Sequence, residues 1–284
     1  EMKEYNQLLQ LQFLSLTWQA ILNLMGQSDG DPAILSGEVM NYEEMLVIAD
    51  KDKIPPLRAQ IQCYRLQLAV FFQDFELAAQ LIGPASMISL VNPANPIIWR
   101  NTLFEGVAAF ELVRQGKKKW KKTAIKAIIR TQKWVDSGNA NCVHILYLLQ
   151  AEKAAMENKT DEARQLFDKA IVTAARNGFR SDRALASERC SLMYHKLGDD
   201  FWFKDYHQKA KDAYKEMEAY GKVDQMTEEP TGKRKTMDRP CFEINVVDDT
   251  MKEGMKVNSD VATLPTRETG ASDDRNWLSS SEAF

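Results

Sequence analysis

One helical pattern recurs along this chain. In TDEARQLFDKAIVTAA, residues 160–175, Ala163, Phe167 and Ala170 lie at i, i+4 and i+7 and so share one helical face. Small, large and small side chains at that spacing let a neighbouring helix approach closely at the alanines and pack against the phenylalanine. We call this i, i+4, i+7 pattern the frame. It recurs at three other places: Ala78, Ile82 and Ala85; Ala124, Ile128 and Thr131; Phe203, His207 and Ala210.

The spacing of these copies favours a repeat fold. They start 46, 39 and 40 residues apart, from 78 to 124 to 163 to 203. A period of that size, with no strand signal between the copies, is typical of stacked helical hairpins. We therefore predict an all-α fold: a right-handed, tetratricopeptide-like superhelical solenoid of antiparallel helical hairpins, followed by a disordered C-terminal tail.

The amino-acid composition restricts the classes of protein to which this chain can belong. Of the 284 residues, 44% are hydrophobic and 27% are charged, an ordinary globular balance. The formal net charge of −3 argues against a nucleic-acid-binding protein defined by bulk charge. Residues 11–25 are too short and too polar to span a membrane, and they lack the features of a secretory signal. Because residue 1 is Glu rather than Met, we expect a fragment of a longer protein.

Cysteine usage indicates the compartment. Cys63, Cys142, Cys190 and Cys241 stand far apart, and none belongs to a CxxC pair. This pattern favours free buried thiols in a reducing, cytoplasmic environment over a disulfide framework or a zinc site.

Ten helices are expected before about residue 223. They cover residues 4–25, a short helix capped by Asn41, 57–72, a helix around Ala78, 97–114, 118–135, a helix of 142–157 capped by Asn141, 160–176, 182–197 and 200–220. This defines a helical-repeat domain over residues 1–223. Residues 224–284 are rich in Pro, Gly, Ser, Thr, Asp and Lys and are predicted to be mostly disordered, with 242–247 as the single candidate strand.

Weak motifs in a consistent order carry a family resemblance. The segment from Ala163 resembles tetratricopeptide-like repeats. Over residues 5–226 the chain is similar to the helical-repeat region of large multidomain signalling proteins that contain a signal-transducing AAA-type ATPase or kinase, many linked to a sensor histidine kinase or a cyclase. The matching residues include Ala20 to Gly26, Asp31, Pro32, Trp134, Asn141, His144, Asn177, Gly178, Phe179, Glu188, Ala210, Tyr214 and Val223.

The chain also departs from this family. Met217 and Glu218 stand where the family usually carries Trp-Gly, and no GxxxxGK[ST] phosphate-binding loop occurs. The resemblance therefore implies a regulatory region without the ATPase, kinase or cyclase activity.

A basic run is the strongest local charge feature. Lys117, Lys118, Lys119, Trp120, Lys121 and Lys122 could bind phosphate, an acidic partner or a membrane surface, with Trp120 as an amphipathic anchor. The simpler interpretation, which we favour, is a solvated helix start with Trp120 turned into a groove between helices. Lysines at a helix N-terminus oppose the helix dipole, which keeps these six residues as candidate partner-binding residues.

Other titratable residues favour structural roles. We expect His144, His195 and His207 to be structural, and the acid pairs at 43–44, 161–162 and 199–200 to lie at helix starts. Glu152 and Glu188 occur in mostly apolar helices and are expected to pair with a buried Arg or to accept hydrogen bonds. Residues 201–203, Phe-Trp-Phe, are expected to close the end of the core, and the basic tripeptide 233–235 is too short to interpret.

These observations favour a binding function. We expect no catalytic, cofactor-binding or metal-ligating residue and no cofactor. The expected function is a non-catalytic interaction and regulatory region of a signal-transducing ATPase or kinase. Its concave face, lined by the first helix of each hairpin, would bind a protein partner, a peptide or the protein's own ATPase. The alternative is a free-standing adaptor with no ATPase attached, and the sequence leaves the oligomeric state open.

Overall fold

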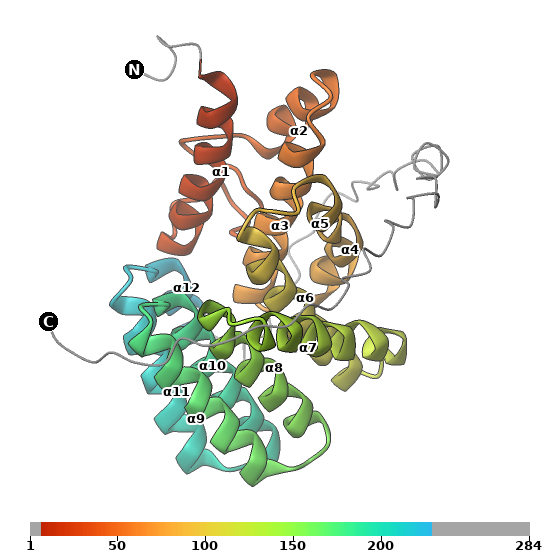
Figure 1. The fold of residues 1–284 in the computed structure, drawn as a ribbon. Helices are drawn as coiled ribbons and strands as arrows, with labels where there is room; N and C mark the ends of the chain where they lie inside the picture. Colours follow the sequence, from red (N-terminus) through yellow and green to blue (C-terminus); the bar gives the residue numbers. More distant parts are fainter. Residues whose placement is uncertain (1–6, 229–284) are drawn as a thin grey trace, which may run out of the picture. The chain divides into compact units, whose positions relative to one another are not determined.

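The computed structural model describes residues 7–228, and all regular secondary structure in this range is helical (Figure 1). The α-helices are α1 (Leu8–Met25), α2 (Tyr42–Lys51), α3 (Pro55–Phe71), α4 (Phe75–Ser86), α5 (Ile88–Val91), α6 (Ile97–Arg114), α7 (Lys121–Asp136), α8 (Val143–Met156), α9 (Thr160–Arg176), α10 (Arg180–Leu197), α11 (Asp200–Lys215) and α12 (Tyr220–Glu228). Two 3-10 helices, η1 (Lys118–Trp120) and η2 (Ala140–Cys142), precede α7 and α8. The predicted all-α class is confirmed for this range.

Consecutive helices pack in pairs. The closest contacts join α3 to α4, α6 to α7, α8 to α9 and α10 to α11. The recurring frame lies on the second helix of each pair, and its small residues are buried, as are Phe167 and Thr131. Ile128, Phe203 and His207 are only half-buried. The predicted contact face is therefore confirmed for the small residues, because a residue as small as alanine lets the facing helix come close.

Helices α6 and α10 are largely buried. Of the 18 residues of α6, 13 are buried, and 12 of the 18 residues of α10 are buried. Gly106 permits part of this packing, because a Cβ at that position would collide with the side chain of Leu149 on α8. These two helices are covered on several sides at once, so polar residues on them require partners inside the protein.

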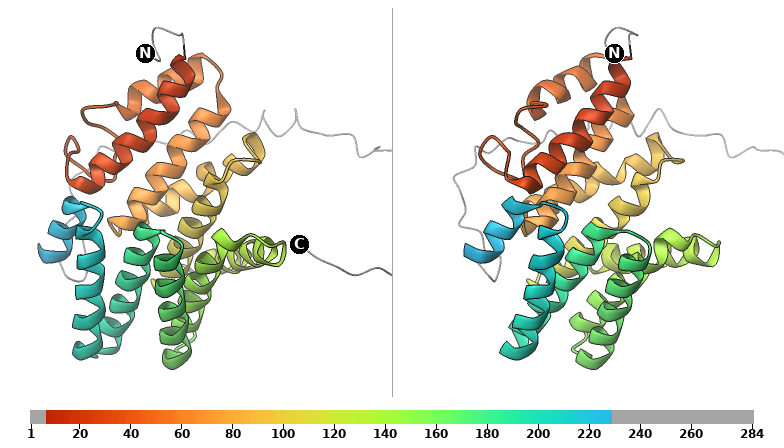
Figure 2. Two further views of the ribbon diagram at one scale, coloured as in Figure 1. Left: turned by 60° about the vertical axis from the view of Figure 1, so that its left-hand side comes forward. Right: turned by 90° about the vertical axis from the view of Figure 1, so that its left-hand side faces the viewer.

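Helix α12 joins the two ends of the described chain. It contacts both α11 and α1, and Figures 1 and 2 show it below the lower end of α1. The Lys222 ammonium donates a hydrogen bond to the carbonyl oxygen of Phe71, and the Gln225 side chain donates to that of Phe72 at 2.9 Å. The last helix of the array is thereby fixed to the end of α3.

The expected final helix, 200–220, differs from the structure. Helix α11 ends at Lys215, Glu218 adopts a left-handed backbone with φ of 59°, and α12 then begins at Tyr220. A residue at positive φ cannot continue a right-handed helix, so the chain turns here. Residues 224–228, which we expected in the tail, are helical. The rest of the expected tail, with the candidate strand 242–247 and the basic tripeptide 233–235, lies outside the described residues.

Two local predictions about helix starts have different outcomes. Asn41 caps α2 as predicted, since its side chain accepts hydrogen bonds from the backbone amides of Glu43 and Glu44 at 2.9 and 3.2 Å. Asn141 does not cap α8. Asn139 instead caps the intervening 3-10 helix by accepting from the amide of Asn141 at 3.1 Å. The short α5 was not expected from the sequence.

Candidate functional site

A buried network of charged side chains connects α6, α8 and α10. Arg189 of α10 donates to Glu152 at 2.7 Å and to Glu111 at 2.6 Å. Arg114 donates to Glu111 at 2.9 Å and also reaches Glu152. Lys196 completes the cluster with a 2.9 Å bond to the other Glu111 oxygen. Three cations therefore surround two anions, which leaves one positive charge in excess.

The electrostatics of this network follow from burial and pairing. Burial alone would raise the pKa of Glu111, but Arg189, Arg114 and Lys196 outweigh it and hold that pKa below its ordinary value. Burial likewise opposes ionisation of Glu152, and the two arginines again lower its pKa. Burial lowers the pKa of Lys196, with Glu111 opposing the effect. Both glutamates are therefore ionised at neutral pH.

An open pocket lies at one end of this network. Its volume is about 180 Å³, and its lining comes from the ends of α6, α8 and α10 and the start of α9. The polar lining residues are Arg114, Glu152, Asn158, Thr160, Arg189 and Lys196, and the apolar ones are Ala155, Met156, Phe167, Leu192, Met193 and Leu197. No side chain caps the N-terminus of α9, whose first residue is Thr160. The pocket thus combines an apolar wall with cationic groups.

Lys196 is the accessible cation of this pocket. Its side chain is 50% exposed, whereas that of Arg189 is 4% exposed. Arg114 is intermediate and is already bonded to both glutamates. A ligand entering the pocket therefore meets the Lys196 ammonium first, with the arginines behind it.

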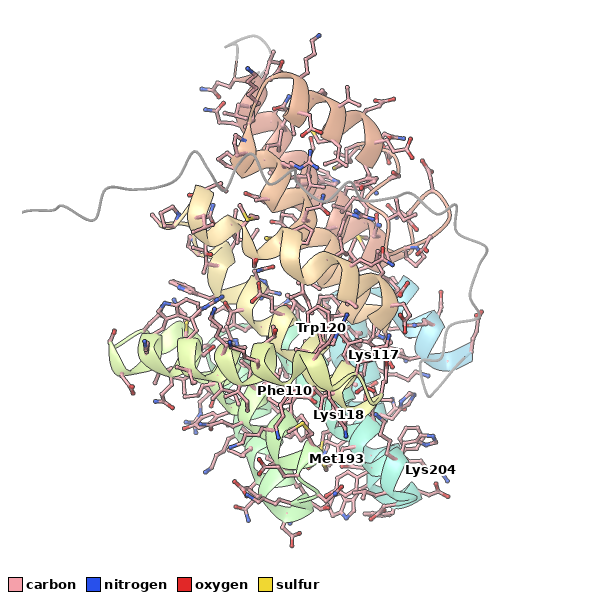
Figure 3. The ribbon with its side chains drawn as sticks, turned by 90° about the vertical axis from the view of Figure 1, so that its right-hand side faces the viewer. Phe110, Lys117, Lys118, Trp120, Met193 and Lys204 are labelled. Atoms are coloured by element: carbon pink, nitrogen blue, oxygen red, sulfur yellow. The ribbon has the colours of Figure 1, made fainter. Side chains whose placement is uncertain are left out.

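One lysine of the predicted basic run acts on the segment beside the pocket. Lys117, three residues after Arg114, pairs with Glu76, and Figure 3 labels Lys117, Lys118 and Trp120 of the run together with the pocket residue Met193. Lys159, and more weakly Lys153 and Lys121, lower the pKa of Glu157, which stands between Met156 and Asn158 of the pocket. Lys121 is therefore the residue of the run whose charge reaches the segment beside the pocket.

The run itself divides between two helices. Lys118, Lys119 and Trp120 form η1, and Lys121 and Lys122 begin α7. The Trp120 ring is half-buried, the Lys119 ammonium lies 5.4 Å from its centre, and the buried indole nitrogen has no hydrogen-bond partner among residues 7–228. Half-burial of Trp120 is compatible with the simpler interpretation, a solvated helix start with the indole in a groove.

The two glutamates singled out from the sequence are both paired. Glu152 lies in the network described above, as predicted. Glu188 accepts hydrogen bonds from the Lys222 ammonium at 2.6 Å, from the Tyr214 hydroxyl at 2.7 Å and from the Gln73 amide at 2.6 Å. The sequence did not identify Glu111, Arg114, Arg189 or Lys196, although charged residues inside otherwise buried helices are a signal that could have found the first three.

The histidines have structural surroundings. His144 is buried, stacks on Phe179, and bonds Asp182 at 2.8 Å through Nε2. Burial would raise the pKa of Asp182, but Arg100 and His144 lower it to about 2. His207 is half-buried on the frame face of α11, and burial lowers its pKa. These contacts support the structural interpretation of His144 and His207.

Cysteines and acid pairs mostly follow the predictions. Cys63, Cys142 and Cys190 are free and buried, and burial raises the pKa of Cys142 to about 11. The acid pairs lie at the starts of α2, α9 and α11. Within the described range no group of three His, Cys, Asp or Glu residues is arranged to hold a metal ion, and no helix has the length and apolar content needed to cross a membrane.

The aromatic cluster of α11 corrects one prediction. Trp202 and Phe203 pack on aromatic neighbours, with the Trp202 ring centre 6.1 Å from that of Tyr194 and the Phe203 ring centre 4.9 Å from that of His195. Phe201 does not close the core, since it is 73% exposed. The first turn of α11 places successive residues about 100° apart, so three consecutive aromatics cannot all face inward.

Comparisons with known proteins give one result. No family model, curated protein or solved structure matches this chain. The resemblance to signalling ATPases therefore remains a prediction.

Ion pairs join α6 to α10, which are both first helices of their pairs. Arg100 bonds Asp182 at 2.9 Å, and Glu111 bonds Arg189. Glu111, Asp182 and Arg189 are buried, whereas the Arg100 side chain is 31% exposed. The concave binding face stays a prediction, and the pocket at the end of the network is an accessible site.

Proposed function

We propose that this region is a non-catalytic interaction and regulatory module. It is a tetratricopeptide-like array of antiparallel helical hairpins, working in the cytoplasm as part of a signal-transducing ATPase or kinase. The pairing of consecutive helices around the recurring small-residue frame supports the repeat architecture. The three buried free thiols support a reducing compartment.

One observation carries the binding function: the pocket with Lys196 at its opening and Met193 and Phe167 in its wall. The network behind it holds one more cation than anion, and the charge of Lys121 reaches Glu157 beside the opening. This chemistry fits an acidic side chain followed by an apolar one on a protein partner. The acidic group pairs with Lys196, and the apolar side chain packs against the wall.

A ligand bound in this pocket can change the contacts between the helices around it. Glu111, Arg114, Glu152 and Arg189 join three helices, so a ligand carboxylate that competes with Glu111 for Lys196 changes the balance of contacts between α6 and α10. A regulatory coupling of this kind is typically about 1–3 kcal/mol. The bound partner is a separate protein or the ATPase of the same protein.

The binding site is tested by peptide selection on the full chain. We expect random 12-residue peptides selected on immobilised protein to contain Asp or Glu next to Leu, Met or Phe. Lys196→Ala should weaken the best peptide about tenfold or more in a fluorescence anisotropy titration, a loss of about 1.4 kcal/mol. Lys209→Ala is the matched control, because Lys209 on α11 is also exposed, at 54%, and pairs with one carboxylate. Equal binding by the two variants would refute this site.

Regulation is tested separately. In a parent protein that carries an ATPase, deletion of residues 1–226 should change the regulated ATPase rate. An unchanged response would contradict the regulatory role while leaving peptide binding to stand, which is the outcome expected of a free-standing adaptor.

A further inference from the structure

Helix α1 carries an apolar stripe on the face turned away from the core. Its inner face packs against α3 and α12 and buries Leu16, Ala20 and Asn23. Away from this inner face, Leu14, Trp18 and Ile21 are exposed by 48%, 55% and 51%, and Ile21 also lines an open pocket beside Tyr64 of α3 and Arg100 of α6. Leu11 and Met25, half-buried, extend the stripe at each end. Helix α1 lies at the outside of this part of the protein (Figure 2).

The spacing of the stripe is that of a helix–helix seam. Residues 11, 14, 18, 21 and 25 follow the alternating steps of three and four that place a and d positions on one line. Large apolar residues at five such positions on one helix, three of them exposed, form a contiguous surface and not scattered exposure. The surface therefore fits another helix lying along α1.

The same spacing is close to symmetrical about Trp18. Its neighbours on the stripe stand at −7, −4, +3 and +7 residues from it, so the outer pair matches and the inner pair differs by one residue, about 1.5 Å along the helix axis. When two such helices cross antiparallel at Trp18, Leu11 faces Met25 of the second copy, and Leu14 lies beside Ile21 of the second copy with that small offset. A surface that matches itself under a two-fold rotation is the requirement for a symmetric dimer.

The lack of charged side chains on α1 disfavours a charged partner helix. Helix α1, LLQLQFLSLTWQAILNLM, contains no Asp, Glu, Lys, Arg or His. A charged partner helix would bury its charges at the edges of this seam without a matching group, whereas a second α1 brings none. The chemistry of the helix is complementary to itself.

We propose that this stripe is the interface of a homodimer, in which α1 of one chain packs antiparallel against α1 of a second copy. An 18-residue helix is about 27 Å long, so the contact falls at the small end of specific interfaces and predicts a dimer with a dissociation constant in the micromolar range. This inference does not depend on the binding pocket, which lies on α6, α8, α9 and α10.

Sedimentation equilibrium of the full chain between about 1 and 100 µM tests the dimer. We expect the mass to double across this range. Trp18→Glu should shift the midpoint about a hundredfold or more to higher concentration, because each dimer contains the substituted residue twice. Val172→Glu, on α9, is the control, since Val172 is equally exposed at 51% but lies outside the stripe. Unchanged helical circular dichroism and thermal midpoint exclude misfolding of either variant.

Cross-linking tests the orientation. In a Cys241→Ser background, chains with Leu14→Cys and chains with Ile21→Cys should form a disulfide when mixed, and Trp18→Cys should cross-link to itself. Leu14→Cys alone should not. Self-cross-linking of Leu14→Cys would indicate a parallel pair and overturn the arrangement. A monomer throughout the concentration range, or a dimer equally weakened by Val172→Glu, would overturn the proposal itself.

Discussion

Gly221 of α12 lies directly against Gly26, the residue that ends α1. A Cβ on Gly221 would stand 2.6 Å from the Gly26 Cα, closer than real side chains approach a backbone atom. Gly26 is near the start of the described chain and Gly221 near its end, and the contact excludes a Cβ on Gly221. A Cβ on Gly26 would stand 3.3 Å from the Gly221 Cα, and the φ of 89° at Gly26 favours glycine there.

Gly221→Ala should therefore destabilise the protein. We expect a loss of about 1–3 kcal/mol in the free energy of unfolding, since the added methyl group forces the two backbones apart. Urea denaturation followed by circular dichroism measures the change. Gly83→Ala is the control, because nothing lies within 4 Å of its Cβ and the residue sits inside α4. Alanine there should be neutral or stabilising by up to about 1 kcal/mol. Equal effects of both substitutions would mean that the contact with Gly26 is unimportant.

Lys222→Met should lower the free energy of unfolding by more than Gly221→Ala does. It leaves the Glu188 carboxylate buried without its cation, and removing one partner of a buried pair costs about 3–5 kcal/mol. Adding Glu188→Gln should recover part of the loss, because the remaining Tyr214 and Gln73 donors can bond an uncharged amide oxygen. The double-mutant cycle in urea denaturation measures this coupling. Additive effects of the two substitutions would show that the pair contributes nothing of its own.

The raised pKa of Glu105 predicts that the protein loses stability as the pH rises. Burial raises its pKa to about 7, despite Arg130 and the hydrogen bond from Asn101. The unfolded chain then releases this proton at lower pH than the folded protein does, so between about pH 4.5 and 7 the folded state holds more protons and stability falls. Over this pH range the free energy of unfolding should fall by about 3 kcal/mol.

Glu105→Gln should remove that dependence. Relative to the variant, the wild-type free energy of unfolding should decline from pH 5 to pH 8, as measured by urea denaturation at each pH. Parallel curves for the two proteins would contradict the raised pKa.

Glu152→Gln should have the opposite pH dependence. The pKa of Glu152 is lowered in the folded protein, so its contribution is present above the unfolded pKa and is lost as the pH falls toward the folded value. At pH 7 the variant leaves Arg189 and Arg114 undercompensated and should lose about 3–5 kcal/mol. The difference in the free energy of unfolding between Glu152→Gln and the wild type should become smaller below about pH 4. A gap of constant size from pH 7 to pH 3 would argue that packing, not charge, is responsible.

The sequence by itself determined most of the helices and the residues that face their neighbours. The spacing of Ala163, Phe167 and Ala170 predicted a buried face because helical periodicity is local, and Asn41 predicted a helix start because its side chain accepts from the amides two and three residues later. Both properties depend on residues a few positions apart. The three described cysteines are free and buried, as predicted.

Only the tertiary structure decided which charges meet and where the surface is open. Arg189 and Glu111 are 78 residues apart, and Lys222 and Phe71 are 151 apart, so no local spacing relates them. Such pairs join α6 to α10, and a pocket lies at the end of the network that they form. The exposure of Phe201 and of the apolar stripe on α1 also depends on tertiary packing. A periodic pattern predicts that a helix has an apolar face, but which face is covered depends on the helices that the rest of the chain brings against it.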